Sequence, residues 1–138
     1  MVGRALAWAR ERIEREPVLV YATSAPEEVA SVQARLGVEA AGALVEDALA
    51  GITRSLVGAG VRKLIVAGGE TAGAVIKALG IAQLRVGPQI DPGVPWMVAP
   101  RDAAAGGPLA VALKSGNFGA TDFFAKALAM LERAGTTR

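Results

Sequence analysis

Two side chains that carry much enzyme chemistry, cysteine and histidine, are missing from this sequence of 138 residues. Without cysteine the chain has no disulfide, no thiolate nucleophile and no zinc site with cysteine ligands. Without histidine it has no Ser-His-Asp triad, no HExxH zinc site and no side chain that normally titrates near neutral pH. Any chemistry therefore depends on carboxylates, hydroxyls, lysine, arginine and backbone amides.

Long apolar runs and strong net charge are also absent. Arg4, Arg10 and the charged stretch at residues 11–15 interrupt the N-terminus, which excludes the apolar core of a signal peptide. No stretch of about 20 apolar residues exists. Fifteen Lys and Arg against thirteen Asp and Glu leave a net charge of +2, with no run of like charges. These features predict a cytoplasmic chain that binds neither membranes nor nucleic acid.

The remaining sequence, 52% hydrophobic, alternates between strand and helix patterns. Apolar runs at 18–21, 64–67 and 109–113 are typical of buried strands, and 84–87 and 94–98 are shorter candidates, the last as an edge strand. Helical patterns cover 4–15, a segment ending near 36, 38–59, the segment after 71, and a closing helix from 121–122; Gly60 is expected in the left-handed conformation. The order predicts one α/β domain over residues 1–138, with a mostly parallel sheet flanked by helices.

Three predicted strand-to-helix turns hold most of the unusual residues, at 21–27, 67–73 and 114–122. Parallel strands would bring all three turns to one edge of the sheet, where helix N-termini direct free N–H groups outward. Such an edge suits an anionic group such as phosphate.

The turn Gly68-Gly69-Glu70-Thr71 fits phosphate binding. Two residues without Cβ let backbone amides approach oxygen atoms, Thr71 adds a hydroxyl, and Glu70 is suited to hold Mg²⁺ through water. An equally weighted alternative is that the glycines only make a tight turn and Thr71 only caps the helix.

The segment from Lys114 to Gly119 is more specific, because it adds a cation, a hydroxyl and the amide of Asn117 to two glycines, one of them Gly116. The alternative is an ordinary turn with Asn117 in the left-handed region. For Thr23 and Ser24, a capping box of Ser24 with Glu27 is favoured over ligand binding.

Other routes to a nucleotide are weaker. No Walker A sequence is present, and no GxGxxG motif follows either apolar strand. Trp8 and Trp96 offer rings for stacking on adenine, although packing is the favoured role of a large aromatic. The segment 91–96 is interpreted as core or interface packing in preference to a base pocket.

Three motifs in order carry a family resemblance: GGETAGAV at 68–75, IDPGVP at 90–95, and LKSGNFG at 113–119 followed by DFF at 122–124. Together they resemble the C-terminal nucleotide-binding domain of the four-carbon acid sugar kinases, over residues 7–131. Some members of this family are also labelled type III effector Hop-like proteins.

The resemblance implies ATP-dependent phosphorylation, with Mg²⁺, of acids such as threonate, erythronate or their 3-oxo relatives. It implies ATP contacts at Gly68, Gly69, Glu70, Thr71 and Gly116, with Asn117 closing over the nucleotide. It also implies a hydroxyl contact in the loop Tyr-Ala-Thr-Ser-Ala-Pro at 21–26, where the family tends to show Tyr-Ser-Ser-Ala-Asp-Pro. Thr23 is the first choice for that contact and Ser24 the second.

Kinases of this family resemble two-domain chains whose large N-terminal domain binds the sugar acid and supplies the proton acceptor. This sequence contains nothing that resembles that domain, so the sugar acid would come through an absent or separately encoded domain, and the catalytic residues stay unknown. The surface such a domain would cover predicts self-association. Two alternatives stay open: a non-catalytic nucleotide-binding or protein-interaction module derived from the family, and an α/β domain without a ligand.

Overall fold

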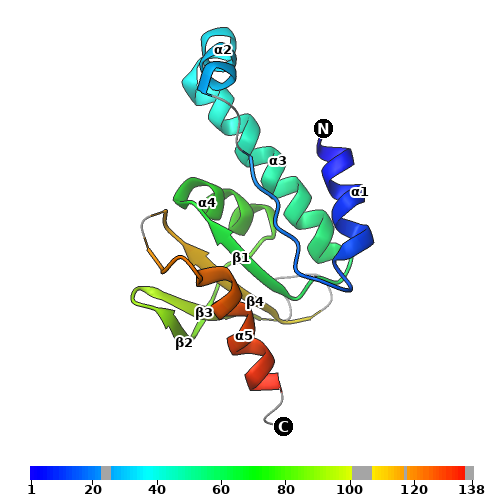
Figure 1. Cartoon of the computed structure of the whole chain (residues 1–138), viewed down its shortest axis with the longest axis vertical. Coiled ribbons are helices and arrows are strands. Elements are labelled where there is room, and N and C mark those ends of the chain that lie inside the picture. Colours follow the sequence, from blue (N-terminus) through cyan, green and yellow to red (C-terminus); the bar gives the residue numbers. More distant parts are fainter. Residues whose placement is uncertain (23–25, 101–106, 117, 136–138) are drawn as a thin grey trace.

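The computed structural model describes residues 1–22, 26–100, 107–116 and 118–135. Over these residues one mixed sheet is covered by helices on both faces (Figure 1). The elements are α1 (Val2–Arg12), α2 (Pro26–Leu36), α3 (Val38–Gly58), β1 (Lys63–Ala67), α4 (Gly69–Ala78), β2 (Arg85–Asp91), β3 (Val94–Ala99), β4 (Leu109–Lys114) and α5 (Phe123–Gly135).

The sheet corrects the prediction of a mostly parallel arrangement. Its order is β1-β4-β3-β2, and β1 runs parallel to β4 whereas β3 is antiparallel to both β4 and β2. The cause lies at Pro92-Gly93, where Gly93 has a φ of 81° and the chain turns back directly from β2 into β3. So short a connection can join only antiparallel strands.

Two strand predictions were wrong in position or kind. β3 was predicted at an edge but lies between β4 and β2, which agrees with the burial of Val94 and Trp96. Residues 18–21 form no strand and belong instead to the segment that joins α1 to α2 (Figure 1). In that segment Val18 and Val20 are half-buried. The apolar run therefore indicated residues that pack against the rest of the protein, but these residues pair with no strand.

Most helix predictions are confirmed. α2 begins at Pro26, whose fixed φ suits a first helical position, and Glu27 and Glu28 follow in its first turn. α3 ends at Gly58, and Gly60 has the positive φ expected, 116°. The N-terminal helix is shorter than predicted, because α1 ends at Arg12.

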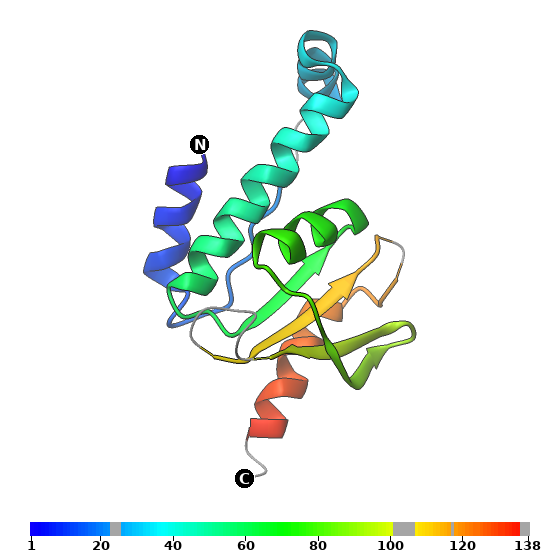
Figure 2. The same ribbon diagram turned by 180° about the vertical axis from the view of Figure 1, so that it is seen from behind.

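α3 and α4 lie on one face of the sheet and α5 on the other (Figure 2), and each face has its own core. On one face Val57 of α3 packs in a cluster with Leu109 of β4, and Val75 of α4 packs in a second cluster with Val66 of β1. On the other face α5 contributes Phe123, which packs with Trp96 of β3. Successive residues of β4 alternate between these cores, as the pleat of a strand requires.

α2 and the adjoining part of α3 project beyond the sheet (Figure 1). α2 buries none of its residues, yet this projecting pair of helices carries exposed apolar side chains, namely Val29, Val32, Leu36, Val38, Leu44 and Val45. We call these six residues the apolar patch. Within the described ranges, no helix is both long and apolar enough to cross a membrane.

Candidate functional site

The carboxyl ends of β1 and β4 lie side by side. Ala67 is paired with Lys114 in the parallel ladder, and the amide of Gly68 donates a hydrogen bond to the carbonyl of Lys114 at 2.8 Å. Two of the three predicted turns therefore meet at one edge of the sheet, as expected. In the third turn, Thr23 and Ser24 lie outside the described residues.

The first of these turns forms the start of α4. Gly68 is the N-cap with a φ of 110°, and its carbonyl accepts the amide of Ala72 at 2.9 Å. Gly68, not Thr71, therefore occupies the capping position. The amides of Gly69, Glu70 and Thr71 lie in the first turn, where backbone N–H groups have no acceptor within a helix. The positive end of the helix dipole faces the same way, so this turn is suited to an anionic group.

The two glycines of this turn differ in what their positions require. A Cβ on Gly69 would meet no atom within 4 Å, so the backbone of this first helical residue is open to approach. A Cβ on Gly68 would lie 3.5 Å from the Thr71 hydroxyl oxygen. The Thr71 hydroxyl therefore lies beside the turn. Gly68 is required mainly because of its positive φ, which residues with a Cβ rarely adopt.

Two carboxylates face each other beside this turn. Glu70 belongs to α4, and Glu46 comes from α3; a hydrogen bond with Glu70 raises the pKa of Glu46, assisted by partial burial and by the charges of Glu70 and Asp47. A close pair of carboxylates favours a shared proton or a cation. Among the described residues, no group of three or more potential ligands is placed to hold a metal ion.

The second turn is the loop from β4 to α5. The ammonium of Lys114 donates to the carbonyl oxygens of Ser115, at 3.2 Å, and Gly116, at 3.1 Å. The amide of Phe118 donates to the Ser115 carbonyl at 3.1 Å. Gly116 is exposed, and a Cβ there would meet nothing within 4 Å. Asn117 itself lies outside the described residues.

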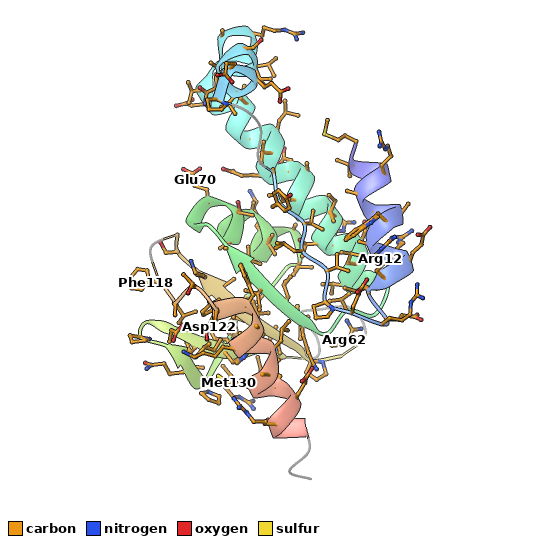
Figure 3. All side chains as sticks on the ribbon, viewed as in Figure 1. Arg12, Arg62, Glu70, Phe118, Asp122 and Met130 are labelled. Carbon is orange, nitrogen blue, oxygen red and sulfur yellow. The ribbon has the colours of Figure 1, made fainter. Side chains whose placement is uncertain are left out.

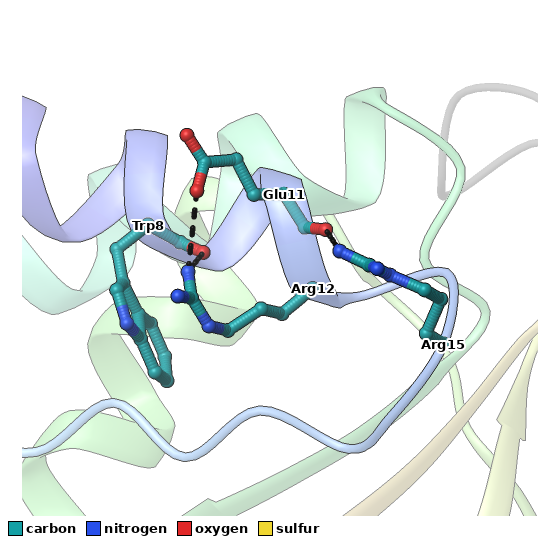
Figure 4. A network of polar contacts seen from close by, with 4 residues as sticks. All are labelled: Trp8, Glu11, Arg12 and Arg15. Atoms are coloured by element: carbon teal, nitrogen blue, oxygen red, sulfur yellow. Dashed lines mark hydrogen bonds and ion pairs between the residues drawn. The ribbon is translucent and has the colours of Figure 1, made fainter.

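Glu70 and Phe118 lie on the same side of the molecule, and Arg12 and Arg62 lie on the opposite side (Figure 3). On that opposite side the guanidinium of Arg12 stacks 4.7 Å from the centre of the Trp8 ring and pairs with Glu11 at 3.3 Å (Figure 4). Trp96 is buried and its indole donates to the carbonyl of Ala127 at 2.9 Å. Packing is thus the role of Trp96, and Trp8 is not at the sheet edge that holds the two turns.

Sequence reasoning missed two residues of this region. Glu46 has no distinguishing mark within a long helix, and only the packing of α3 against α4 brings it to Glu70. Asp91 was assigned with its neighbours to packing, but its carboxylate accepts the amide of Ala120, in the loop after β4, at 3.1 Å. The sequence did offer one signal for Asp91, a carboxylate directly before the Pro-Gly turn in the motif IDPGVP.

Comparisons with known proteins identify the family of this chain. The family model of the nucleotide-binding C-terminal domain matches residues 1–124. A 3-oxo-tetronate kinase of Pseudomonas fluorescens is 59% identical over 131 residues, which are 95% of this chain and 29% of that protein. A 3-oxo-tetronate kinase of Burkholderia multivorans is 58% identical over 97% of this chain and 30% of that protein.

A crystal structure of a Haemophilus influenzae protein has the same fold, with a TM-score of 0.79 and 36% identity, over 94% of this chain and 30% of that one. The chain thus spans about 30% of the length of the kinases it matches. The chain belongs to the family of nucleotide-binding C-terminal domains found in the four-carbon acid sugar kinases.

Proposed function

We propose that this chain is the ATP-binding part of a kinase that phosphorylates a four-carbon sugar acid of the 3-oxo-tetronate, threonate or erythronate class. The observation that carries the proposal is the junction between the two motif turns, made by the Gly68 amide and the Lys114 carbonyl at 2.8 Å. At this junction the first amides of α4, a glycine turn and a second loop lie at one edge of the sheet. That combination suits a polyphosphate.

In this proposal the amides of Gly69, Glu70 and Thr71 hold phosphate oxygens, and Gly116 with Asn117 approaches the nucleotide from the neighbouring loop. Thr23, with Ser24 as second choice, would add a hydroxyl from the segment before α2. Mg²⁺ would bind beside Glu70, because the facing carboxylates of Glu46 and Glu70 together attract a cation. Mg²⁺ commonly takes only one or two protein carboxylates and completes its shell with water and phosphate oxygens.

The reaction would be an in-line transfer. A hydroxyl oxygen of the sugar acid forms a bond to the γ-phosphorus, the bond from that phosphorus to the β-phosphate oxygen breaks, and ADP departs. The hydroxyl proton would pass to an acceptor in a sugar-binding part of the kinase. This chain would contribute position and charge stabilisation.

The experiment is a calorimetric titration of the chain with Mg-ATP, in which Gly69→Val is compared with Gly73→Val. At both positions a Cβ would meet no atom within 4 Å, and both lie on α4, but only Gly69 is at its first residue. We expect Gly69→Val to abolish detectable binding and Gly73→Val to retain it, because the added methyl groups cover the phosphate-facing amides only in the first variant.

Two results would contradict the proposal. Equal binding by the folded Gly69→Val variant would show that the nucleotide lies elsewhere. Absence of binding by the unmodified chain would instead favour the second candidate, an interaction module derived from this family. The exposed apolar patch on α2 and α3 is the observation that favours that candidate.

A further inference from the structure

Asp91 is the one charged residue that is buried in the part of the chain that the structure describes, with 7% of its surface exposed. It stands at the end of β2, directly before the turn into β3. One carboxylate oxygen accepts the amide of Ala120 at 3.1 Å, and the other pairs with the ammonium of Lys126 on α5. Asp91 therefore connects the β2–β3 turn to two places: Ala120, in the loop after β4, and Lys126, on α5.

Aromatic rings hold the same loop from two further directions. The ring of Phe118 lies against Gly93, since a Cβ on Gly93 would approach its Cε1 to 3.1 Å. A Cβ on Gly119 would approach the ring of Phe123 to 2.8 Å, so any larger residue there would displace the loop or the helix. The loop is thus fitted between the β2–β3 turn and the first residue of α5.

The contacts of Lys114 also determine which backbone groups of the loop are engaged and which stay exposed. The ammonium of Lys114 binds the carbonyl oxygens of Ser115 and Gly116, which are the groups that would repel a phosphate. Gly116 remains exposed with open space around it. A loop fixed in this manner can offer N–H groups to an anion without first rearranging.

We propose that Asp91 is a positioning residue for nucleotide binding: its contacts with Ala120 and Lys126 fix the loop after β4 so that Gly116 meets the nucleotide. The inference rests on the proposed function and adds residues that the motif comparison leaves without a role. The hydrogen bonds from Lys126 and from the Ala120 amide lower the pKa of Asp91, which keeps its carboxylate ionised, and so able to accept both, at neutral pH.

The test compares Mg-ATP binding by the unmodified chain, Asp91→Asn, Lys126→Met and Lys126→Arg, with Lys77→Met as a control. Lys77 is exposed in the last turn of α4, so its replacement removes the same charge at the end of the helix away from Gly69. We expect Lys126→Met and Asp91→Asn to bind roughly tenfold or more weakly, because each removes a charge-assisted hydrogen bond that holds the loop. Lys126→Arg should restore most of the affinity and Lys77→Met should retain it.

A second readout separates positioning from stability. The amide signal of Ala120 in a nuclear magnetic resonance spectrum should shift in Asp91→Asn and Lys126→Met and return in Lys126→Arg, with the thermal midpoint recorded alongside. A lower midpoint with unchanged affinity in the folded variants would overturn the inference and leave the proposed function intact. Failure of the unmodified chain to bind Mg-ATP would overturn the proposed function, and the inference with it, whatever the Ala120 signal does.

Discussion

At the scale of single residues, the facing carboxylates of Glu46 and Glu70 repel each other at neutral pH. The pKa of Glu46 is raised by its hydrogen bond with Glu70, by partial burial and by neighbouring negative charge. A raised pKa means that the folded chain prefers the protonated side chain more than the unfolded chain does. The pair therefore stabilises the fold at pH values below the unfolded pKa, about 4.3 for glutamate, and this contribution is lost as the pH rises through the folded pKa.

We expect Glu46→Gln to raise the thermal midpoint at neutral pH, because it removes one of two facing charges and keeps a hydrogen-bonding side chain. The gain should shrink as the pH falls toward about 4, where Glu46 is protonated in the unmodified chain as well. Calorimetric melting at several pH values measures this difference. Glu14→Gln, in the exposed segment after α1, removes the same charge and should produce no comparable gain. A loss of stability in Glu46→Gln at neutral pH would refute the assigned repulsion.

The sequence supplied the candidate residues of the two turns but not all of their neighbours. Gly68, Gly69 and Gly116 were named as candidates because they follow predicted strand ends and belong to motifs that resemble those of the family, and their contact with a nucleotide stays a prediction. Glu46 and Lys126 were not found, because a charged residue on a helix usually faces water and its partner is set only by tertiary packing. Thr23, Ser24 and Asn117 stay predictions, since they lie outside the described residues.

At the scale of elements, β4 is the centre of the fold. It pairs with β1 on one side and β3 on the other, and Leu109 and Val111 are fully buried against the α3 and α4 face. Helix positions were well predicted because apolar spacing identifies a helix locally. Strand order was not, because the alternation of residues fixes which face is buried but not which strand lies alongside.

The central place of β4 predicts a large stability loss for Leu109→Ala. Removing most of a side chain with 0% exposure leaves a cavity among rigid neighbours, and we expect a cost of about 2–5 kcal/mol. Urea unfolding followed by circular dichroism measures it. Val86→Ala, on β2 with 69% exposure, is the matched control and should cost roughly 0.5 kcal/mol or less. Similar losses in the two variants would contradict the core assignment of β4.

At the scale of the whole molecule, the two motif turns and the apolar patch occupy different parts of the surface. The patch lies on α2 and the adjoining part of α3, which project beyond the sheet (Figure 1). The chain covers about 30% of the kinases it matches. Under the proposed function, the rest of the kinase is one candidate to cover the patch, and a second copy of this chain is another.

We expect the isolated chain to self-associate at high concentration through the apolar patch, and the double variant Val32→Lys with Leu44→Lys to weaken that association. Both side chains are exposed, so their replacement should change the thermal midpoint little. Sedimentation velocity over a range of concentrations measures the association. Val86→Lys, an exposed apolar residue on β2, tests whether any added charge has the same effect. A clean monomer of the unmodified chain at the highest concentration would contradict this expectation.

The mixed sheet also has a consequence for how the chain reaches its native state. β2 and β3 are joined by a two-residue turn, so their pairing closes a very short loop, whereas the pairing of Lys63 in β1 with Ala110 in β4 closes a loop that contains α4, β2 and β3. Pairings between distant segments are slow to form, because chain entropy is lost before contacts compensate for it. The β2–β3 hairpin is thus expected to fold early and the β1–β4 ladder late. The junction between Gly68 and Lys114 would then be among the last contacts to form.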